Sequence, residues 1–200
     1  MSLPLPEPLI IDDDLTTPFL YPRDKRHDFR QSWDNGGVAL SNPNEGLTKY
    51  VWHCYTDGQS IYLKRDDVND WQLILTDSNI SEVDFTFDQN MRACLVWVAN
   101  GLAKMQAYDS VSQSVKITEY RNIKNPRVSL DDKRKFNIAN SDIIFGYVRD
   151  GNLCYRLQRE RYTIEHILAT DARKNTLVRI GMGRKLRFMF DWREVLTPTP

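Results

Sequence analysis

Apolar and polar residues alternate along most of the chain from residue 36 onward. The segment VDFTFD at 83–88 places Val83, Phe85 and Phe87 on one face and polar residues on the other. The segment KLRFMFDW at 185–192 repeats this pattern with Leu, Phe and Trp residues. Because successive side chains of a β-strand point to opposite faces, both segments predict half-buried antiparallel strands.

Helical periodicity is weak by comparison. No window keeps an apolar stripe at the helical spacing of about 3.6 residues over several turns. The apolar residues of YTIEHILATDARK at 162–174 fit both periods, but the Tyr, Thr and Ile residues of this segment favour a strand. The predicted fold class is therefore all-β, built from antiparallel sheets.

Apolar runs end three times in an Asp-Gly or Asn-Gly pair, and each pair is followed by a second alternating run. These residue pairs favour tight β-hairpin turns, because such turns need a positive φ at both central positions. The chain therefore repeats one kind of hairpin, in the segments YTDG at 55–58, VANG at 98–101 and VRDG at 148–151.

The repetition extends beyond the turns. Residues 80–91, ISEVDFTFDQNM, align with residues 123–134, IKNPRVSLDDKR, so that Phe85 falls on Val128 and the strand faces agree. Each unit is predicted as a strand ending in an Asp-containing turn, an apolar strand, a Gly hairpin and a further strand, which is the pattern of a propeller blade. The predicted units lie near 36–78, 79–121 and 122–169, with a closing hairpin at 175–193.

The number of units limits the architecture. Closed propellers use about 4 to 8 four-stranded blades, so three units and a hairpin are too few for the larger rings. The sequence therefore predicts blade-like sheets that stack as a partial propeller or as a sandwich, or that are completed by other copies of the chain.

Residues 1–35 differ from the β domain predicted for residues 36–200. Proline recurs in this segment and prevents any regular element, so an extended N-terminal arm is expected. The alternative is a loose, solvated terminus. The arm is too apolar for that alternative, and we expect it to lie along its own domain or a neighbour, with these partner-binding candidates: Leu9, Ile10, Phe19, Leu20 and Tyr21.

Charge and composition exclude several classes of partner. The 200-residue chain has 27 Lys and Arg residues and 27 Asp and Glu residues, so no global field favours nucleic acid or an anionic membrane. A local basic patch is the remaining alternative. No signal peptide and no apolar run of about 20 residues is present, and we expect a soluble chain made in the cytoplasm. The cysteines, Cys54, Cys94 and Cys154, are too far apart for a zinc motif and are expected in the core.

No arrangement of residues predicts catalysis, a cofactor or a metal. His27, His53 and His166 occur singly, and the GxSxG, GxxxxGK[ST] and GxGxxG motifs are missing from the sequence. The GMG at 181–183 falls between two predicted strands, where a hairpin turn is expected instead of a phosphate loop. The chain is therefore predicted not to be an enzyme.

Repeated acidic residues are the remaining catalytic candidates, because glycosidases use two carboxylates. Asp88 and Asp131 occupy equivalent positions, as do Asp57 and Asp150, but Asp residues at repeated turns are expected for structural reasons. The sialidase motif SxDxGxTW is also missing from the sequence. Tryptophans are expected in the core first, although four of them could offer stacking surfaces for a sugar: Trp52, Trp71, Trp97 and Trp192.

The sequence resembles a family of tailed-bacteriophage virion structural proteins, encoded among tail and head-to-tail genes. The resemblance runs from about residue 31 to residue 193, and its strongest motifs are SLDDKR, NSDII and YVRDGNLCYRLQRERY. It also includes GGVALSNPNEGL, ISEVDFTFDQNM and TLVRIGMGRKLRFMF. No catalytic residue belongs to the resemblance.

The resemblance implies a non-enzymatic tail component present in many copies, similar to the nozzle or hub proteins of short-tailed phages. Its implied partners are other virion tail proteins and copies of itself, and its implied location is the tail of the virion. The alternative is a receptor-binding or glycan-binding tail module that contacts a host surface glycan, and a glycan-degrading enzyme is the least favoured reading.

Overall fold

In a computed structural model of the chain, the described residues form four antiparallel sheets. Three sheets have four strands each, and the fourth has two strands. The structure describes residues 35–40, 49–65, 68–88, 92–131, 142–170, 175–182 and 188–194. The predicted arm at 1–35, with its partner-binding candidates, lies outside the described residues except for Asn35.

Each four-stranded sheet is a meander in which strands adjacent in sequence are also hydrogen-bonded neighbours. The first sheet contains β1 (Asn35–Leu40), β2 (Lys49–Thr56), β3 (Ser60–Arg65) and β4 (Gln72–Thr76). The second sheet contains β5 (Ile80–Phe87), β6 (Ala93–Ala99), β7 (Leu102–Asp109) and β8 (Ser114–Tyr120). The third sheet contains β9 (Ile123–Leu130), β10 (Ile143–Arg149), β11 (Asn152–Leu157) and β12 (His166–Ala169), and the fourth contains β13 (Asn175–Met182) and β14 (Phe188–Glu194).

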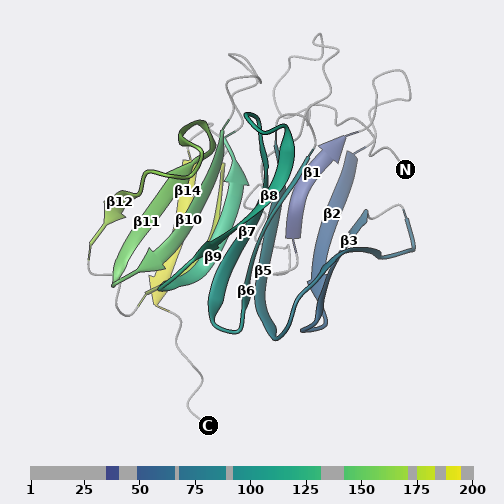
Figure 1. Ribbon diagram of the computed structural model, residues 1–200, viewed down its shortest axis with the longest axis horizontal. Helices are drawn as coiled ribbons and strands as arrows, with labels where there is room; N and C mark the ends of the chain where they lie inside the picture. Colours follow the sequence, from purple (N-terminus) through teal and green to yellow (C-terminus); the bar gives the residue numbers. More distant parts are fainter. Residues whose placement is uncertain are drawn as a thin grey trace.

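The sheets pack face to face in the order of the sequence, as the first three show in Figure 1. The first strands of successive sheets are neighbours, because β1 contacts β5, β5 contacts β9 and β9 contacts β13. The stack does not close on itself. The prediction of an all-β fold with antiparallel blade-like sheets is therefore confirmed, and each sheet begins and ends within a few residues of its predicted unit.

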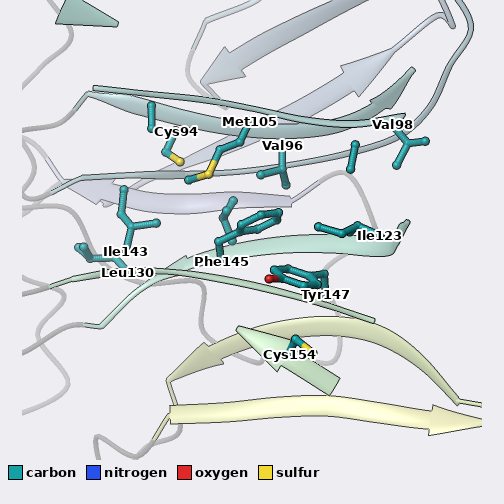
Figure 2. Packing of buried hydrophobic residues seen from close by; sticks show 13 residues of the cluster. Cys94, Val96, Val98, Met105, Ile123, Leu130, Ile143, Phe145, Tyr147 and Cys154 are labelled. Atoms are coloured by element: carbon teal, nitrogen blue, oxygen red, sulfur yellow. The ribbon is translucent and has the colours of Figure 1, made fainter. Parts of the chain in front are cut away.

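Three apolar clusters hold the stack together, one between each pair of successive sheets. Figure 2 shows the middle cluster, in which Val96 and Met105 of the second sheet face Phe145 and Tyr147 of the third. In all three clusters, the earlier sheet contributes buried residues mainly from its second and third strands. The later sheet contributes mainly from its first and second strands. The stack therefore repeats one packing arrangement.

The repeated Gly pairs form tight turns in two of the three sheets. Asn100 and Gly101 join β6 to β7, Asp150 and Gly151 join β10 to β11, and all four residues have positive φ. This is the geometry of the type I′ hairpin turn that the sequence predicted. In the first sheet the loop is longer, because Thr56 pairs with Ile61.

The prediction of a half-buried strand is wrong for β5. Phe85 and Phe87 face the first sheet, as expected, but Asp84 and Thr86 on the opposite face are also buried. The carboxylate of Asp84 accepts a hydrogen bond from the backbone N–H of Val128 at 2.9 Å. Since β5 lies inside a stack, a sheet covers each of its faces, and the buried carboxylate of Asp84 is tolerated there because it is hydrogen-bonded across the interface.

The ambiguous segment at 162–174 is a strand only in part. Strand β12 covers His166–Ala169, and a short 3-10 helix, η3 (Gln158–Glu160), precedes the turn that leads into it. Residues 171–174 lie outside the described part of the chain. The strand prediction is therefore confirmed for the middle of this segment.

Candidate interaction surface

Among the described residues, the first sheet has one face that no other sheet covers. We call it the outer face and define it by Tyr55 on β2, Tyr62 on β3 and Leu73 on β4, with Trp71 beside them. The register places these residues together, because Tyr55 pairs with Tyr62 and Tyr62 pairs with Leu73. Tyr55 is 46% exposed, Trp71 44% and Leu73 54%. The outer face is thus a solvent-exposed cluster of three aromatic rings and one aliphatic side chain.

Ring contacts order this cluster. Tyr55 and Tyr62 are stacked with ring centroids 6.1 Å apart, and Tyr55 and Trp71 are tilted with centroids 5.7 Å apart. The ammonium group of Lys64 lies 5.9 Å from the centroid of the Trp71 ring, within the range of a cation–π contact. The rings therefore form a connected apolar surface with a cation at its border.

Asp57 fixes the end of the outer face nearest the β2–β3 loop. Its carboxylate accepts backbone hydrogen bonds from Gln59 at 2.8 Å and Ser60 at 2.7 Å, and the Tyr62 hydroxyl donates to it at 3.1 Å. The backbone hydrogen bond from Gln59 and the other donors hold the pKa of Asp57 below its ordinary value. Asp57 thus acts as an anionic turn residue that also orients an aromatic ring.

Trp97 and Tyr147 occupy the position equivalent to that of Tyr55 in the second and third sheets. Each lies on the second strand of its sheet and faces the preceding sheet, and their exposed fractions are 1% and 0%. Tyr55 lies on the second strand of the first sheet, on the face opposite to Cys54, which packs against the second sheet. The outer face therefore occupies the position of a sheet-to-sheet interface, but no sheet formed by the described residues precedes it.

The polar end of Trp97 is held by a small ionic cluster. Its Nε1 donates to the carboxylate of Asp77 at 2.8 Å, and Lys104 Nζ donates to the same oxygen at 2.8 Å. Partial burial opposes ionisation of Asp77, but the hydrogen bonds from Lys104 and Trp97 outweigh it and lower its pKa. The carboxylate of Asp77 thus holds the Trp97 indole in place between the first and second sheets.

The hydroxyl of Tyr147 belongs to a larger network. It donates to Glu165 at 2.6 Å, and Arg149 and Arg156 donate to the same carboxylate at 2.8 and 3.3 Å. Burial and the hydrogen bond to Glu165 raise the pKa of Tyr147. Burial opposes ionisation of Glu165, but the bonds from Tyr147 and Arg149 lower its pKa.

Arg156 connects this network to the backbone. Its Nε donates to the Tyr147 hydroxyl at 2.6 Å, and its Nη1 donates to the carbonyl oxygens of Tyr162 and Thr163, each at 2.8 Å. The network resembles a catalytic cluster in composition, but its members bond to one another and to the backbone that leads into β12. We therefore interpret it as a structural clamp in the third sheet.

The predicted stacking tryptophans are placed differently from one another. Trp52 and Trp97 are buried in the cluster between the first and second sheets, and Trp192 packs against the cluster between the third and fourth sheets. The expectation that tryptophans lie first in the core is therefore confirmed for Trp52 and Trp97, and the alternative of a sugar-stacking surface is wrong for these two residues. Trp71 is exposed and contributes to the outer face.

The other candidates have structural surroundings. His166 stacks on Tyr155 with ring centroids 4.9 Å apart, and its Nε2 lies 2.7 Å from Glu160 Oε2. His53 is half-buried on β2, opposite Lys64, and His27 lies outside the described residues. The three cysteines are buried, as the sequence indicated for core residues, and they form no disulfide bond. In the part of the chain that the structure describes, no group of three or more His, Cys, Asp or Glu residues is arranged to hold a metal ion.

The repeated Asp residues behave largely as turn residues. Asp88 closes the loop after β5, where its Oδ1 accepts from the Arg92 N–H at 2.8 Å and its N–H donates to the Arg92 carbonyl. The Asp131 N–H donates to the Asp142 carbonyl in the matching loop after β9. Asp150 lies in the type I′ turn with φ of 49°. The structural interpretation of these acidic residues agrees with their hydrogen bonds.

Sequence reasoning missed Tyr55, Tyr62 and Leu73 as surface residues. The alternation in β2 and β3 already showed that these residues share a face, since Tyr55 and Cys54 are adjacent and point in opposite directions. The alternation does not show which of the two faces a neighbouring sheet covers, because that depends on the order in which the sheets stack.

Comparisons with protein families, curated proteins and solved structures found no match to this chain. Among the described residues, no helix has the length and the apolar character needed to cross a membrane.

Proposed function

We propose that the chain is a non-enzymatic structural component of a bacteriophage tail, a nozzle, hub or tail-associated protein that assembles in many copies. The observation that carries the proposal is the open stack of blade-like sheets, which ends in an exposed aromatic face. A part of this kind supplies rigid faces and edges to neighbours without an active site. The sequence resemblance to phage tail proteins supplies the phage context.

The architecture supports a scaffolding role through its rigidity. Buried residues bind each pair of successive sheets, and the polar groups of the Tyr147 network are bonded to one another and to backbone. Densely packed interiors transmit force with little deformation, which suits a part that must hold its shape in a particle. The proposed location is the tail of the virion, with other tail proteins and further copies of the chain as partners.

The test is the composition of purified particles from a phage that encodes this chain. Quantitative mass spectrometry should find several copies per tail, and the purified chain should turn over no host polysaccharide. A chain that is missing from particles, or that clears polysaccharide on its own, would contradict the proposal.

The N-terminal segment extends the proposal to assembly. Residues 1–35 are proposed to bind a neighbouring subunit through their large apolar side chains, each of which contributes roughly 1.5–3 kcal/mol when buried. Deletion of residues 2–30 should leave a folded β domain that no longer enters particles. Normal incorporation of the truncated chain would show that the arm has no role in assembly.

A receptor-binding or glycan-binding tail module is the second candidate, and the exposed rings of Tyr55 and Trp71, with the partly exposed ring of Tyr62 beside them, favour it. Aromatic faces with polar groups at their border are suited to stacking on sugar rings. Binding of the isolated protein to host cells or to a glycan array would support this candidate if Trp71→Ala abolished the binding without loss of the β-sheet circular dichroism signal. Trp71 replaces the buried tryptophans as the residue to test.

A further inference from the structure

The outer face of the first sheet is suited to binding an extended, proline-rich segment. The rings of Tyr55, Tyr62 and Trp71 contact one another, with centroids 6.1 and 5.7 Å apart, and no sheet of the described residues covers them. Proline-rich segments bind to aromatic-lined sites in the polyproline II conformation, because this helix exists before binding and little entropy is lost. The outer face therefore has the chemistry of a polyproline-binding site.

The chain itself contains such a segment at residues 3–11, which read LPLPEPLII with proline at positions 4, 6 and 8. A residue that precedes proline is restricted to extended conformations, so this sequence favours polyproline II over an α-helix. Side chains three positions apart share one face of that helix, since it has three residues per turn. Two of the three resulting stripes are entirely apolar, and the third carries the one charged residue. The stripes are Leu3, Pro6 and Leu9, then Leu5, Pro8 and Ile11, and then Pro4, Glu7 and Ile10.

The repeat of this helix matches the spacing of the outer face. Polyproline II rises about 3.1 Å per residue, so neighbouring side chains of one stripe lie about 9 Å apart. Tyr55 on β2 and Leu73 on β4 both pair with Tyr62, so two strand spacings, or about 10 Å, separate them. One turn of the helix laid across the strands therefore brings one apolar side chain to each border of the ring cluster.

The arm joins the first sheet beside the outer face. Asn35 begins β1 and pairs with His53 on β2, and Tyr55 follows on the same face as His53, about 7 Å along the strand. Residues 12–34 connect the proline-rich segment to β1, and a chain of this length reaches up to about 75 Å when extended. The segment is therefore long enough to reach the outer face of a neighbouring copy.

We propose that residues 3–11 dock in the polyproline II conformation on the outer face of the next copy of the chain. The docked segment covers Tyr55 and Trp71, in the place that a preceding sheet takes over Trp97 and Tyr147. The inference rests on the proposed function for the presence of neighbouring copies, and it deepens that function by naming the surface that receives the arm.

The first experiment measures association of the full chain by analytical ultracentrifugation up to about 1 mM, at which even a millimolar contact is substantially populated. We expect concentration-dependent association of the wild type. The triple variant Pro4→Ser, Pro6→Ser and Pro8→Ser should associate at least tenfold more weakly, because it loses both the preformed helix and the ring contacts. The matched control is the double variant Pro18→Ser and Pro22→Ser, which changes the same arm outside the docking segment and should associate normally.

The same measurement tests the receiving surface. Trp71→Ala should also weaken association at least tenfold, because it removes the largest ring of the outer face. Ile117→Ala on β8 is its control, since Ile117 is 57% exposed in the second sheet, whose two faces are already packed. If Trp71→Ala does not keep the wild-type circular dichroism spectrum, Tyr55→Ser replaces it.

A wild type that stays monomeric throughout this range would overturn the inference, as would normal association of the triple proline variant. Weakening by Trp71→Ala alone would also contradict it, because the outer face would then meet another surface, such as the outer face of a second copy. If the isolated protein retains a glycan and Trp71→Ala abolishes the retention while the triple proline variant does not, the surface belongs to the glycan-binding candidate.

The second experiment determines which copy receives the arm. Glu7 is on the charged stripe, and Lys64 borders the ring cluster with its ammonium group 5.9 Å from the Trp71 centroid. Glu7→Cys and Lys64→Cys variants are treated with a short bis-maleimide, first separately and then as a mixture at about 1 mM. Docking on the next copy predicts covalent dimers in the mixture and background levels in either variant alone, as in the wild type, whose three cysteines are buried. Glu7→Cys mixed with Ile117→Cys is the positional control and should give background levels.

A chain that carries both Glu7→Cys and Lys64→Cys tests the alternative of docking within one copy. Cross-linking inside this chain, without dimers in the mixture, would show that the arm covers its own outer face and would overturn the assignment to the next copy. Background levels in both experiments would contradict docking altogether.

The outcomes separate this inference from the proposed function. If the chain is abundant in particles and the triple proline variant enters them normally, the docking is wrong and the tail function stands. If the arm docks on the outer face of a second copy but the chain is missing from particles, the docking stands and the tail function is wrong.

Discussion

Tyr147 and Tyr55 lie on the second strand of their sheets, on the face directed away from the next sheet, yet their surroundings are opposite. Tyr147 is fully buried beneath the second sheet, and its hydroxyl donates to Glu165. Tyr55 is almost half exposed, and its ring contacts Tyr62 on β3 and Trp71 just before β4. Burial of a side chain in this fold therefore depends on the neighbouring sheet and not on the strand that carries it.

The largest expected effect compares a covered residue with one on the outer face. Phe145 is completely buried between the second and third sheets, so Phe145→Ala should lower the free energy of unfolding by about 3–5 kcal/mol. Tyr55→Ala should lower it by only about 1 kcal/mol, because the half-exposed side chain loses its ring contacts with Tyr62 and Trp71 but leaves no cavity in a core. Urea denaturation at low protein concentration measures both values, and equal losses would contradict the comparison.

The next effect concerns space between the third and fourth sheets. A Cβ atom at Gly146 would lie 3.2 Å from Phe190 Cε1 and 3.3 Å from Leu177 Cδ2. Gly146→Val should therefore destabilise the protein by about 1–3 kcal/mol through overpacking. Tyr55→Trp enlarges a side chain on the outer face and should have little effect, so its thermal melting curve serves as the control. A Gly146→Val variant with wild-type stability would mean that these two sheets are not in close contact.

A smaller, pH-dependent effect is expected for Glu165 and Asp57, two carboxylates that each accept a hydrogen bond from a tyrosine hydroxyl. The pKa of Glu165 is lowered in the folded state, so its contribution to stability is present above the unfolded value of about 4.3 and is lost as the pH falls below it. Glu165→Gln should lower the free energy of unfolding by about 1–2 kcal/mol at pH 7 and flatten its fall between about pH 5 and 3. The pKa of Asp57 is also lowered, but this residue is exposed, so Asp57→Asn should alter the pH profile much less. Chemical denaturation across this pH range distinguishes the two, and identical profiles would contradict the structural role of Glu165.

The smallest effect concerns the hairpin turns. Asn100 has φ of 52° in a type I′ turn, a conformation that Asn tolerates better than Ala. Asn100→Ala should cost about 1 kcal/mol. Asn100→Gly, which keeps a residue suited to positive φ, should cost less, and thermal melting of the two variants should separate them. Equal stability of both variants would show that the turn conformation adds little to the fold.

Much of the fold could be predicted because it depends on local signals. The period-two pattern located the strands, and the Gly pairs located the hairpins of the second and third sheets, where positive φ is required at Asn100 and Asp150. Coverage by neighbours could not be predicted in the same way. Asp84 and Thr86 have the sequence pattern of a solvent face, yet β9 covers them.

The candidate surface was harder to predict than the fold for the same reason. Trp52 and Tyr55 are both aromatic residues on β2, and their chemistry alone favours Trp52 as a stacking surface. The two residues lie on opposite faces of the first sheet, and this decides which of them is exposed. Trp52 packs against Phe87 of the second sheet, whereas Tyr55 points outward. The identity of the residues indicated interaction chemistry, but the order of the sheets was needed to place it.

Our central proposal is that the chain is a multi-copy part of a phage tail whose first sheet contacts a neighbouring subunit through its outer face. A cryo-electron microscopy map of particles from a phage that encodes this chain tests the claim most directly. We expect several symmetry-related copies in the tail, with the outer face of the first sheet of each copy covered by a neighbouring subunit. A map in which the outer face of the first sheet is exposed to solvent in every copy, or in which the chain is missing from the tail, would contradict it.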